Sequence, residues 1–289
     1  MRICIFNPEH DLCLAKGRAH YVPPRSAVEF ARRDAQAVMG VLYPDASCCS
    51  VYDLQLSTVN CQRSTVTAWG WDAVVKHELL KRGIPANLLP SDEEINTIRE
   101  LQHRSTILPL QEDCREVRSI EEMETLLKKS EHWVMKAPWS GAGRGLRWVH
   151  GALTAIDRDW LLKTVATQRC VIAEPRREVV ADVALEYMER WHPAGTLSSL
   201  PAFLGYSYFK TGSGVYKENI AWSDERIETT FALLPVRQRV EQWLGDNVWP
   251  RYRGPLGVDL MVCQDGSVHV SEINFRHTMG MVAHERFKI

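Results

Sequence analysis

The sequence carries no excess of charge of either sign. Its 289 residues include 35 Lys or Arg and 36 Asp or Glu, which gives a formal net charge of −1. Proteins that bind nucleic acid or an anionic membrane surface by electrostatics have a clustered basic excess. We therefore expect neither a nucleic-acid partner nor a membrane partner.

Long apolar segments and paired cysteines are also missing. The first apolar run has only four residues before the polar segment NPEHD (7–11), too few for a signal peptide or a membrane span. The eight cysteines form no C-x-x-C pair, so a structural zinc site is not expected. Scattered thiols are typical of a reducing compartment, and we expect a cytoplasmic protein.

What the first part of the sequence does have is an alternation of short β-like runs and helical patterns. The run RICIF (2–6) precedes an amphipathic pattern at 26–43, and further β-like runs follow. This order predicts a Rossmann-like parallel α/β domain over residues 1–100. Ligands gather at the carboxyl ends of the strands of such a sheet, where NPEHD and WGWD (69–72) would lie.

A helix is expected at 91–104, between this region and the rest of the chain. Ser91 followed by Glu94 is the capping-box pattern of a helix start. Beyond this helix, apolar runs occur in pairs typical of antiparallel strands: HWVMKAP with GLRWVH, RCVIAEP with DVALEYME, and LGVDLMVC with SVHVSEINF. The second half is therefore expected to be α+β.

The last of these hairpins brings two acidic residues together. Asp265-Gly266 is a signal for a two-residue type I′ turn, in which both central residues have positive φ. Pairing outward from this turn places Val262 opposite His269 and Asp259 opposite Glu272. Like charges in direct opposition repel, so they need proton sharing, displacement into solvent, or a cation between them.

The side-chain period of two adds a third oxygen donor to this pair. Asn274 lies on the same face of the strand as Glu272, and Arg276 follows it. Asp259, Glu272 and Asn274 are hard oxygen ligands of the kind that Mg²⁺ takes. A solvated acidic hairpin edge is the alternative interpretation, and the position of Asn274 argues against it.

The segment KAPWSGAGRGL (136–146) is rich in glycine and begins with Lys136. It is not a Walker A loop, because its lysine precedes the glycines. It is also a poor dinucleotide fingerprint, because the expected context is strand, loop, strand and no helix begins there. Alone it is as well explained by a flexible hairpin tip. Beside an oxygen cluster, its backbone N–H groups and Lys136 are suited to phosphate.

In combination these features resemble the ATP-grasp enzymes. That family has a strand ending in lysine before a glycine-rich loop, then an acid after an apolar strand, then an acid on one strand and E-x-N on the next. The matching segments here are VMKAPWSGAGRGL, CVIAEP and GVDLMVCQDGSVHVSEINFR. The resemblance covers roughly residues 100–280 and implies a two-subdomain ATP-grasp fold, with a small subdomain at 101–180 and a large one at 181–289.

The resemblance also implies roles for the matching residues. Lys136 would contact the ATP phosphates, Glu174 would lie at the adenine hinge, and Asp182 would lie near the ribose. Arg104 stands where the family commonly has a lysine. The full set of implied nucleotide contacts is Lys136, Ser140, Gly141, Gly143, Arg144, Gly145, Glu174, Asp182 and Arg104.

The metal and catalytic roles follow from the same resemblance. Asp259, Glu272 and Asn274 would hold Mg²⁺, for which Mn²⁺ is an alternative. Arg276 would face the transferred phosphate and act with Lys136 in catalysis.

Four further residues are candidates for substrate contacts. His10 and Asp11 follow the first expected strand, where they are suited to binding substrate or moving protons; the alternative is an exposed polar turn. Tyr208 and Lys210 lie in a segment rich in aromatic and basic residues, which is either a substrate loop or an exposed connection.

The activity that the resemblance implies is ATP-dependent ligation. The γ-phosphate would move to a substrate carboxylate, and an amine or similar nucleophile would attack the acyl phosphate. Small-molecule carboxylates and amines are the expected partners, and a homodimer is left open. Two alternatives remain: a small-molecule kinase of the same fold, and a nucleotide-binding protein without turnover.

Overall fold

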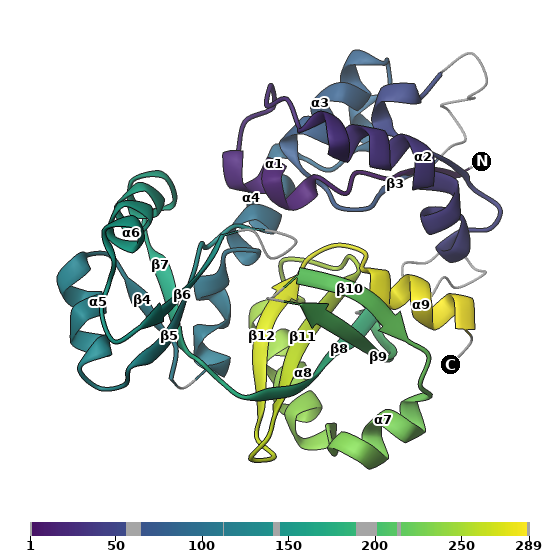
Figure 1. Ribbon diagram of the computed structural model, residues 1–289. Helices are drawn as coiled ribbons and strands as arrows, with labels where there is room; N and C mark the ends of the chain where they lie inside the picture. The colour runs from purple at the N-terminus through teal and green to yellow at the C-terminus, as the bar shows by residue number, and fades with distance from the viewer. Residues whose placement is uncertain are drawn as a thin grey trace.

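A computed structural model describes residues 2–55, 65–111, 113–140, 145–188, 201–212 and 215–287. Within these ranges the chain forms three sheets with helices packed against them (Figure 1). The N-terminal unit lies at the top of this view, a four-stranded sheet at the left and a five-stranded sheet below. In the described ranges, no helix combines the length and the apolar character needed to cross a membrane.

The N-terminal unit contains a parallel sheet in the order β2-β1-β3, as expected. Its strands are β1 (Arg2–Ile5), β2 (Ser47–Cys49) and β3 (Thr65–Ala68). Its helices are α1 (His10–Lys16), α2 (Arg25–Leu42), α3 (Ala73–Lys81) and the short 3₁₀ helices η1 (Val51–Asp53) and η4 (Ala86–Leu88). Helix α2 confirms the amphipathic pattern at 26–43, because its buried residues recur at helical spacing.

Helix α4 (Asp92–Leu101) lies at the position that the capping-box pattern predicts. The Ser91 hydroxyl accepts from the Glu94 backbone N–H at 3.1 Å, and the Ser91 N–H donates to the Glu94 carboxylate at 2.7 Å. The 3₁₀ helix η5 (Arg104–Leu110) follows it and packs against strand β12 (Val268–Asn274). This stretch therefore leads the chain from the N-terminal unit to the remaining sheets.

The four-stranded antiparallel sheet has the order β4-β7-β5-β6. Its strands are β4 (Arg115–Val117), β5 (His132–Lys136), β6 (Leu146–His150) and β7 (Val171–Pro175), and its helices are α5 (Ile120–Leu127) and α6 (Ala155–Gln168). The hairpin expected between HWVMKAP and GLRWVH is confirmed as β5–β6.

The pairing expected between RCVIAEP and DVALEYME is wrong. Strand β7 pairs on one edge with β4 and on the other with β5, so it has no free edge for the strand that follows. That strand, β8 (Val179–Met188), instead enters the next sheet and pairs with β9 (Ala202–Gly212) and β11 (Leu256–Cys263).

The five-stranded antiparallel sheet has the order β10-β9-β8-β11-β12, where β10 is Val215–Ile220. One face covers a large core with α7 (Asp224–Phe231) and α8 (Leu234–Asn247). Helix α9 (Met279–Phe287) packs against both β9 and α2, so the end of the described chain joins the five-stranded sheet to the N-terminal unit.

The turn of the β11–β12 hairpin differs from the expected type I′ turn. Within the described loop 264–266, positive φ occurs at Gly266 alone, at +82°. This is the pattern of a three-residue loop that ends in a left-handed glycine. As a result His269 pairs with Met261 and not with Val262 as expected.

A β-bulge restores the pairing that matters for the site. Leu260 pairs with Val270, whereas Asp259 pairs with Glu272, so Ser271 is the extra residue on β12. The two acidic residues are thus opposite each other as predicted, although the turn and the bulge that place them there were not foreseen.

Candidate active site

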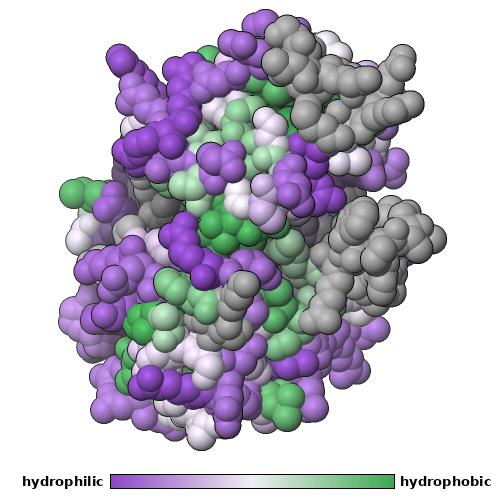
Figure 2. Space-filling view, turned by 90° about the vertical axis from the view of Figure 1, so that its right-hand side faces the viewer, coloured by the Kyte–Doolittle hydropathy of each residue, from purple (hydrophilic) through white to green (hydrophobic). Residues whose placement is uncertain are grey.

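A cavity of about 1030 Å³ lies where the three sheets meet. Its lining comes from three strands of the four-stranded sheet, from all five strands of the five-stranded sheet, and from η5 and the start of α9. The N-terminal unit adds residues of α1 and α2 and of the loops that follow β1 and β3. On the face of the molecule seen in Figure 2, hydrophobic residues gather near the middle, between hydrophilic residues above and below. Because residues that follow β1 and β3 line the cavity, the carboxyl ends of these parallel strands contribute to it. Ligand sites of parallel sheets are generally at this end of the strands.

Lys136 projects into this cavity from the end of β5. Val134 and Lys136 line the cavity. The alternate residues of β5, Trp133 and Met135, pack in the core beneath, as the period of two requires. The Lys136 Nζ lies 2.9 Å from a carboxylate oxygen of the buried Glu174 on β7 and 3.4 Å from the Ser271 hydroxyl. The lysine and the acid expected at the nucleotide site are therefore neighbours.

Arg104 joins the glycine-rich segment to the acidic hairpin. Its guanidinium donates to the Ala137 carbonyl at 2.6 Å, to the Ser140 hydroxyl at 2.7 Å and to the Glu272 carboxylate at 2.7 Å. Gly145 has φ +89°, and a Cβ there would lie 2.8 Å from the Ser140 Cβ, so this position requires glycine. Gly141, Gly143 and Arg144 lie outside the described residues.

Asp259 and Glu272 form a close acidic pair on the cavity wall. Burial, with the neighbouring charges of Glu272 and Glu186, raises the pKa of Asp259 to about 8. The Asn274 amide nitrogen donates to Asp259 at 3.1 Å, and its oxygen accepts from Arg276 at 2.9 Å. Two opposed carboxylates with an amide beside them are a donor set that fits a hard divalent cation.

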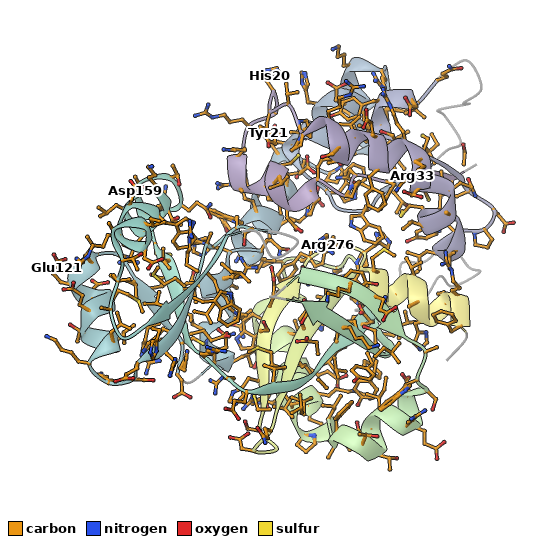
Figure 3. All side chains as sticks on the ribbon, in the orientation of Figure 1. His20, Tyr21, Arg33, Glu121, Asp159 and Arg276 are labelled. Carbon is orange, nitrogen blue, oxygen red and sulfur yellow. The ribbon has the colours of Figure 1, made fainter. Side chains whose placement is uncertain are left out.

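Arg276 links this cluster to the N-terminal unit. Its guanidinium donates to both carboxylate oxygens of Asp11, at 3.2 and 3.0 Å. Burial opposes ionisation of Asp11, but the Arg276 charge holds the pKa of its carboxyl below the usual value. Figure 3 shows Arg276 between the N-terminal unit and the five-stranded sheet. Of the two N-terminal substrate candidates, Asp11 therefore reaches the cavity.

His10 does not line the cavity. Its ring is fully buried, with Nδ1 3.1 Å from the Asp72 carboxylate, which also accepts from the Asn7 amide at 3.0 Å. A Cβ at Gly70 would lie 2.5 Å from the imidazole, so glycine is required there. The segments NPEHD and WGWD thus form a buried network between two strand ends. A substrate contact of His10 is therefore not supported, and the alternative of an exposed turn is wrong.

Tyr208 and Lys210 project away from the cavity. Tyr208 packs in the core beneath the sheet, 4.8 Å from the ring of Trp222, and Lys210 forms an exposed ion pair with Glu218. Both side chains lie on the face of β9 that points away from the cavity, which we call its outer face. The substrate contacts expected of them are therefore not supported. The cavity-lining residues of β9 have the opposite parity and are Ser207, Phe209 and Thr211.

Strand β8 contributes one expected residue and one that the sequence reasoning missed. Asp182 lines the cavity and accepts from the Thr211 hydroxyl at 2.7 Å, and burial raises its pKa. Glu186, four residues later on the same face, also lines the cavity and is only 1% exposed. The period of two from Asp182 was the signal that could have identified it.

Comparison with known proteins gives structural matches only. No protein-family model and no curated protein matches the chain. An N5-carboxyaminoimidazole synthetase from Staphylococcus aureus, solved with ADP, aligns over 96% of this chain and 70% of its own at 14% identity and a TM-score of 0.56. A D-cycloserine synthetase aligns over 100% and 99%, at 13% identity and a TM-score of 0.54.

A third structure is similar to the same extent. A biotin carboxylase from Campylobacter jejuni, in a complex with β-γ-ATP, aligns over 98% of this chain and 67% of its own, at 13% identity and a TM-score of 0.53. At such identities these matches show a shared fold.

Proposed function

We propose that this chain, which has the ATP-grasp fold, is an ATP-dependent ligase. It would activate a substrate carboxylate as an acyl phosphate for attack by an amine or similar nucleophile. The observation that carries the proposal is one cavity that brings Lys136 and Glu174 together with the opposed acids Asp259 and Glu272. Phosphoryl transfer needs mainly positioning and neutralisation of charge, which these groups supply.

The nucleotide would lie between the four-stranded and five-stranded sheets. Lys136 is suited to the phosphates, because its ammonium is buried at the end of β5 and is already held by Glu174. Glu174 on β7 and Asp182 on β8 both line the cavity, and we propose that they contact the adenine and the ribose. The contacts proposed for Gly141, Gly143 and Arg144 remain predictions.

Arg104 has a proposed role that differs from that of a family lysine. Its guanidinium is held by Ser140 and Glu272, so it fixes the base of the glycine-rich segment to the hairpin that carries the acids. We infer that it positions these two elements around the phosphates as well as adding positive charge.

A divalent cation, Mg²⁺ or Mn²⁺, fits the residues of the hairpin. Asp259, Glu272 and Asn274 would hold it, since the charge of Glu272 opposes ionisation of Asp259 and all three side chains offer hard oxygens. When bound, the cation would neutralise charge on the transferred phosphate.

The chain's own residues would orient the substrate carboxylate. Arg276 is fixed in place by two bonds to Asp11 and one to Asn274, so its guanidinium is presented to the cavity with little freedom. It would bind the carboxylate, and later the acyl phosphate, by charge-assisted hydrogen bonds. Its burial between the N-terminal unit and the sheet would also exclude water from the intermediate.

Release of ADP from MgATP tests the proposal. The chain is incubated with a panel of carboxylates, each with and without a panel of amines. Turnover that requires both a carboxylate and an amine is the expected result. A stable phosphorylated product would instead indicate a kinase, and nucleotide binding without turnover for every pair would indicate a non-catalytic protein. The cytoplasmic location and the homodimer stay predictions.

A further inference from the structure

Glu186 is a buried carboxylate to which the proposed mechanism gives no role. It lies on the cavity face of β8 and is 1% exposed. The Ser207 hydroxyl donates to one of its oxygens at 2.8 Å and the Thr278 hydroxyl donates to the other at 2.7 Å. A carboxylate has about four acceptor sites, so this one can accept further hydrogen bonds.

The charge of Glu186 has no cationic partner among the described residues. Three of the carboxylates that line the cavity are buried, Asp11, Glu174 and Glu186, and two of them are paired, Asp11 with Arg276 and Glu174 with Lys136. Glu186 forms no ion pair within the described ranges. Burial therefore raises its pKa. A buried carboxylate without a counter-charge is costly, and a bound cation would remove that cost.

A second free acceptor lies on the same wall. The Asn219 amide nitrogen donates to the Met279 carbonyl at 3.0 Å and to the Tyr216 hydroxyl at 2.8 Å, which fixes the orientation of the amide. Its oxygen is buried and accepts no hydrogen bond from any described residue. Asn219 lines the cavity, and Met279 is adjacent to Gly280, which packs on Glu186.

Two glycines allow the backbone to pack closely against the Glu186 carboxylate. A Cβ at Gly280 would lie 1.8 Å from a Glu186 oxygen and 2.3 Å from the Ser207 hydroxyl, and a Cβ at Gly257 would lie 2.9 Å from the other Glu186 oxygen. Neither glycine has a positive φ, so each is required for space and not for backbone conformation.

The neighbouring part of the lining is apolar and aromatic. Phe6, Phe30 and Trp69 line the cavity, with ring centroids 5.4 Å apart for Phe6 and Phe30 and 5.2 Å apart for Phe6 and Trp69. Met279 packs against the core cluster that contains Phe6 and Trp69. Acceptors and an apolar wall thus meet around Met279 and Gly280.

We propose that this end of the cavity binds a substrate with a protonated primary amine next to an aromatic or branched apolar group, with Glu186 as its counter-ion. The ammonium has three N–H donors, for which Glu186 and the Asn219 oxygen are acceptors. This inference rests on the proposed ligase function, for which it names a substrate class. The amine belongs either to the nucleophile or to the carboxylate substrate itself.

Binding measurements test this without requiring turnover. Isothermal titration in the presence of MgADP is carried out with 2-phenylethylamine, isoamylamine, L-phenylalanine and 3-phenylpropanoate. The three amines are expected to bind, and 3-phenylpropanoate, which lacks an amine, is expected to bind at least about tenfold more weakly than L-phenylalanine. If L-phenylalanine is the tightest, amine and carboxylate belong to one substrate. If the simple amines bind as tightly as L-phenylalanine, the amine is the nucleophile.

Variants separate recognition by Glu186 from a purely structural role. Glu186→Gln keeps the shape of the side chain and is expected to weaken amine binding at least about tenfold, with unchanged affinity for MgADP. Gly280→Ala, whose Cβ would displace the Glu186 carboxylate, should cause the same loss. Lys210→Ala, on the outer face of β9, is the control and should bind amines like the parent.

Two results would overturn the inference: failure of the parent to bind any of the amines, or equal amine affinity of Glu186→Gln and the parent. Failure of the ligase proposal is distinguishable, because it would show as amine binding without carboxylate-dependent ADP release.

Discussion

At the residue scale, the cavity is organised by matched charges that come from different sheets. Lys136 faces Glu174 across β5 and β7, and Arg104 connects η5 to Glu272 on β12. The pair of Asp259 and Glu272 is the exception, because two like charges face each other in register. Their repulsion is the physical reason to expect a cation there.

Asp259→Asn is expected to stabilise the protein without metal and to weaken its response to metal. The folded-state pKa of Asp259, about 8, lies above its ordinary value of 3.8. The folded state therefore keeps a proton that the unfolded chain releases, and the free energy of unfolding falls as pH rises from about 4 to about 8. Asp259→Asn cannot ionise at this position, so its free energy of unfolding does not fall for this reason.

Thermal melts at pH 8 check this, in EDTA and then with MgADP. In EDTA the variant should melt above the parent, by roughly 2–4 °C for each 1 kcal/mol regained. With MgADP the parent should gain more than the variant. Equal stabilisation of both proteins by MgADP would contradict the metal assignment.

Lys136→Ala is expected to abolish ATP turnover and weaken nucleotide binding at least about tenfold, because it removes the positive charge proposed for the phosphates. Glu272→Gln should also abolish turnover. Lys210→Ala is the matched control and should turn over at the parent rate. Circular dichroism must show that the variants fold, since Lys136→Ala removes the ion-pair partner of the buried Glu174. Turnover of either site variant at the parent rate would show that the assignment is wrong.

Some of these residues could be predicted and others could not. Asp259, Glu272 and Asn274 are close in sequence, and hairpin periodicity alone groups them. Nothing local encodes the contact of Arg276 with Asp11, because the two lie at opposite ends of the chain. Glu186 lies on the same face of β8 as Asp182, which the sequence spacing indicates. Its proposed role depends on the absence of a cationic partner among the described residues, and only the fold reveals that.

At the scale of elements, the β11–β12 hairpin combines a tight loop with a bulge. In a regular strand Ser271 and Glu272 would point to opposite faces, yet both line the cavity. The bulge explains this, since two residues of β12 oppose one residue of β11 there. It also brings the Ser271 hydroxyl to Lys136, a contact that simple alternation would exclude.

A pair of glycine substitutions tests the conformation of the loop. Gly266→Ala places a Cβ in open space but at φ +82°, so it should lower the free energy of unfolding by about 1 kcal/mol through backbone strain alone. Gly245→Ala, in α8, also meets nothing within 4 Å and has no positive φ. It should raise stability by about 0.5–1 kcal/mol. Urea unfolding measures both, and a stabilising effect of Gly266→Ala would contradict the loop geometry.

Element prediction succeeded where the signals are local. The capping box of α4 and the apolar spacing of α2 lie within single helices, so the sequence indicates them directly. The pairing of strands is not local. The expected β7–β8 hairpin failed because both edges of β7 are occupied by β4 and β5, which come earlier in the chain.

At the scale of the whole molecule, the C-terminal segment fastens the five-stranded sheet to the N-terminal unit. The His277 N–H donates to the Trp69 carbonyl at 2.9 Å, and its ring contacts the same carbonyl and the Tyr43 hydroxyl, at 3.1 and 2.8 Å. Arg276 makes the neighbouring contact with Asp11. The cavity therefore depends on docking of the two units around residues 276–277.

This docking should be sensitive to acid. Burial lowers the pKa of His277 from 6.5 to about 4, so the unfolded chain takes up a proton between these values that the folded state refuses. The contribution of neutral His277 to the free energy of unfolding is fully present above pH 6.5 and is lost as pH falls to about 4. This loss is on the order of 3 kcal/mol.

Urea unfolding across this pH range measures the effect as the difference between parent and variant. His277→Gln is expected to show a flatter pH dependence than the parent, together with lower stability at pH 7. His20→Gln is the control, because His20 lies on the surface (Figure 3) and should leave the parent profile unchanged. An equal slope for the parent and His277→Gln would contradict the account of the docking.

The acyl phosphate is the central claim, and the transfer of ¹⁸O from substrate to phosphate tests it most directly. The chain is incubated with MgATP, an amine and the carboxylate selected by ADP release, labelled with ¹⁸O in its carboxyl group. Phosphorus NMR then reports the isotope content of the released phosphate. The account predicts that ¹⁸O from the carboxylate appears in the phosphate, because the bond between them forms and then breaks on the carbon side. Phosphate without the label would contradict it.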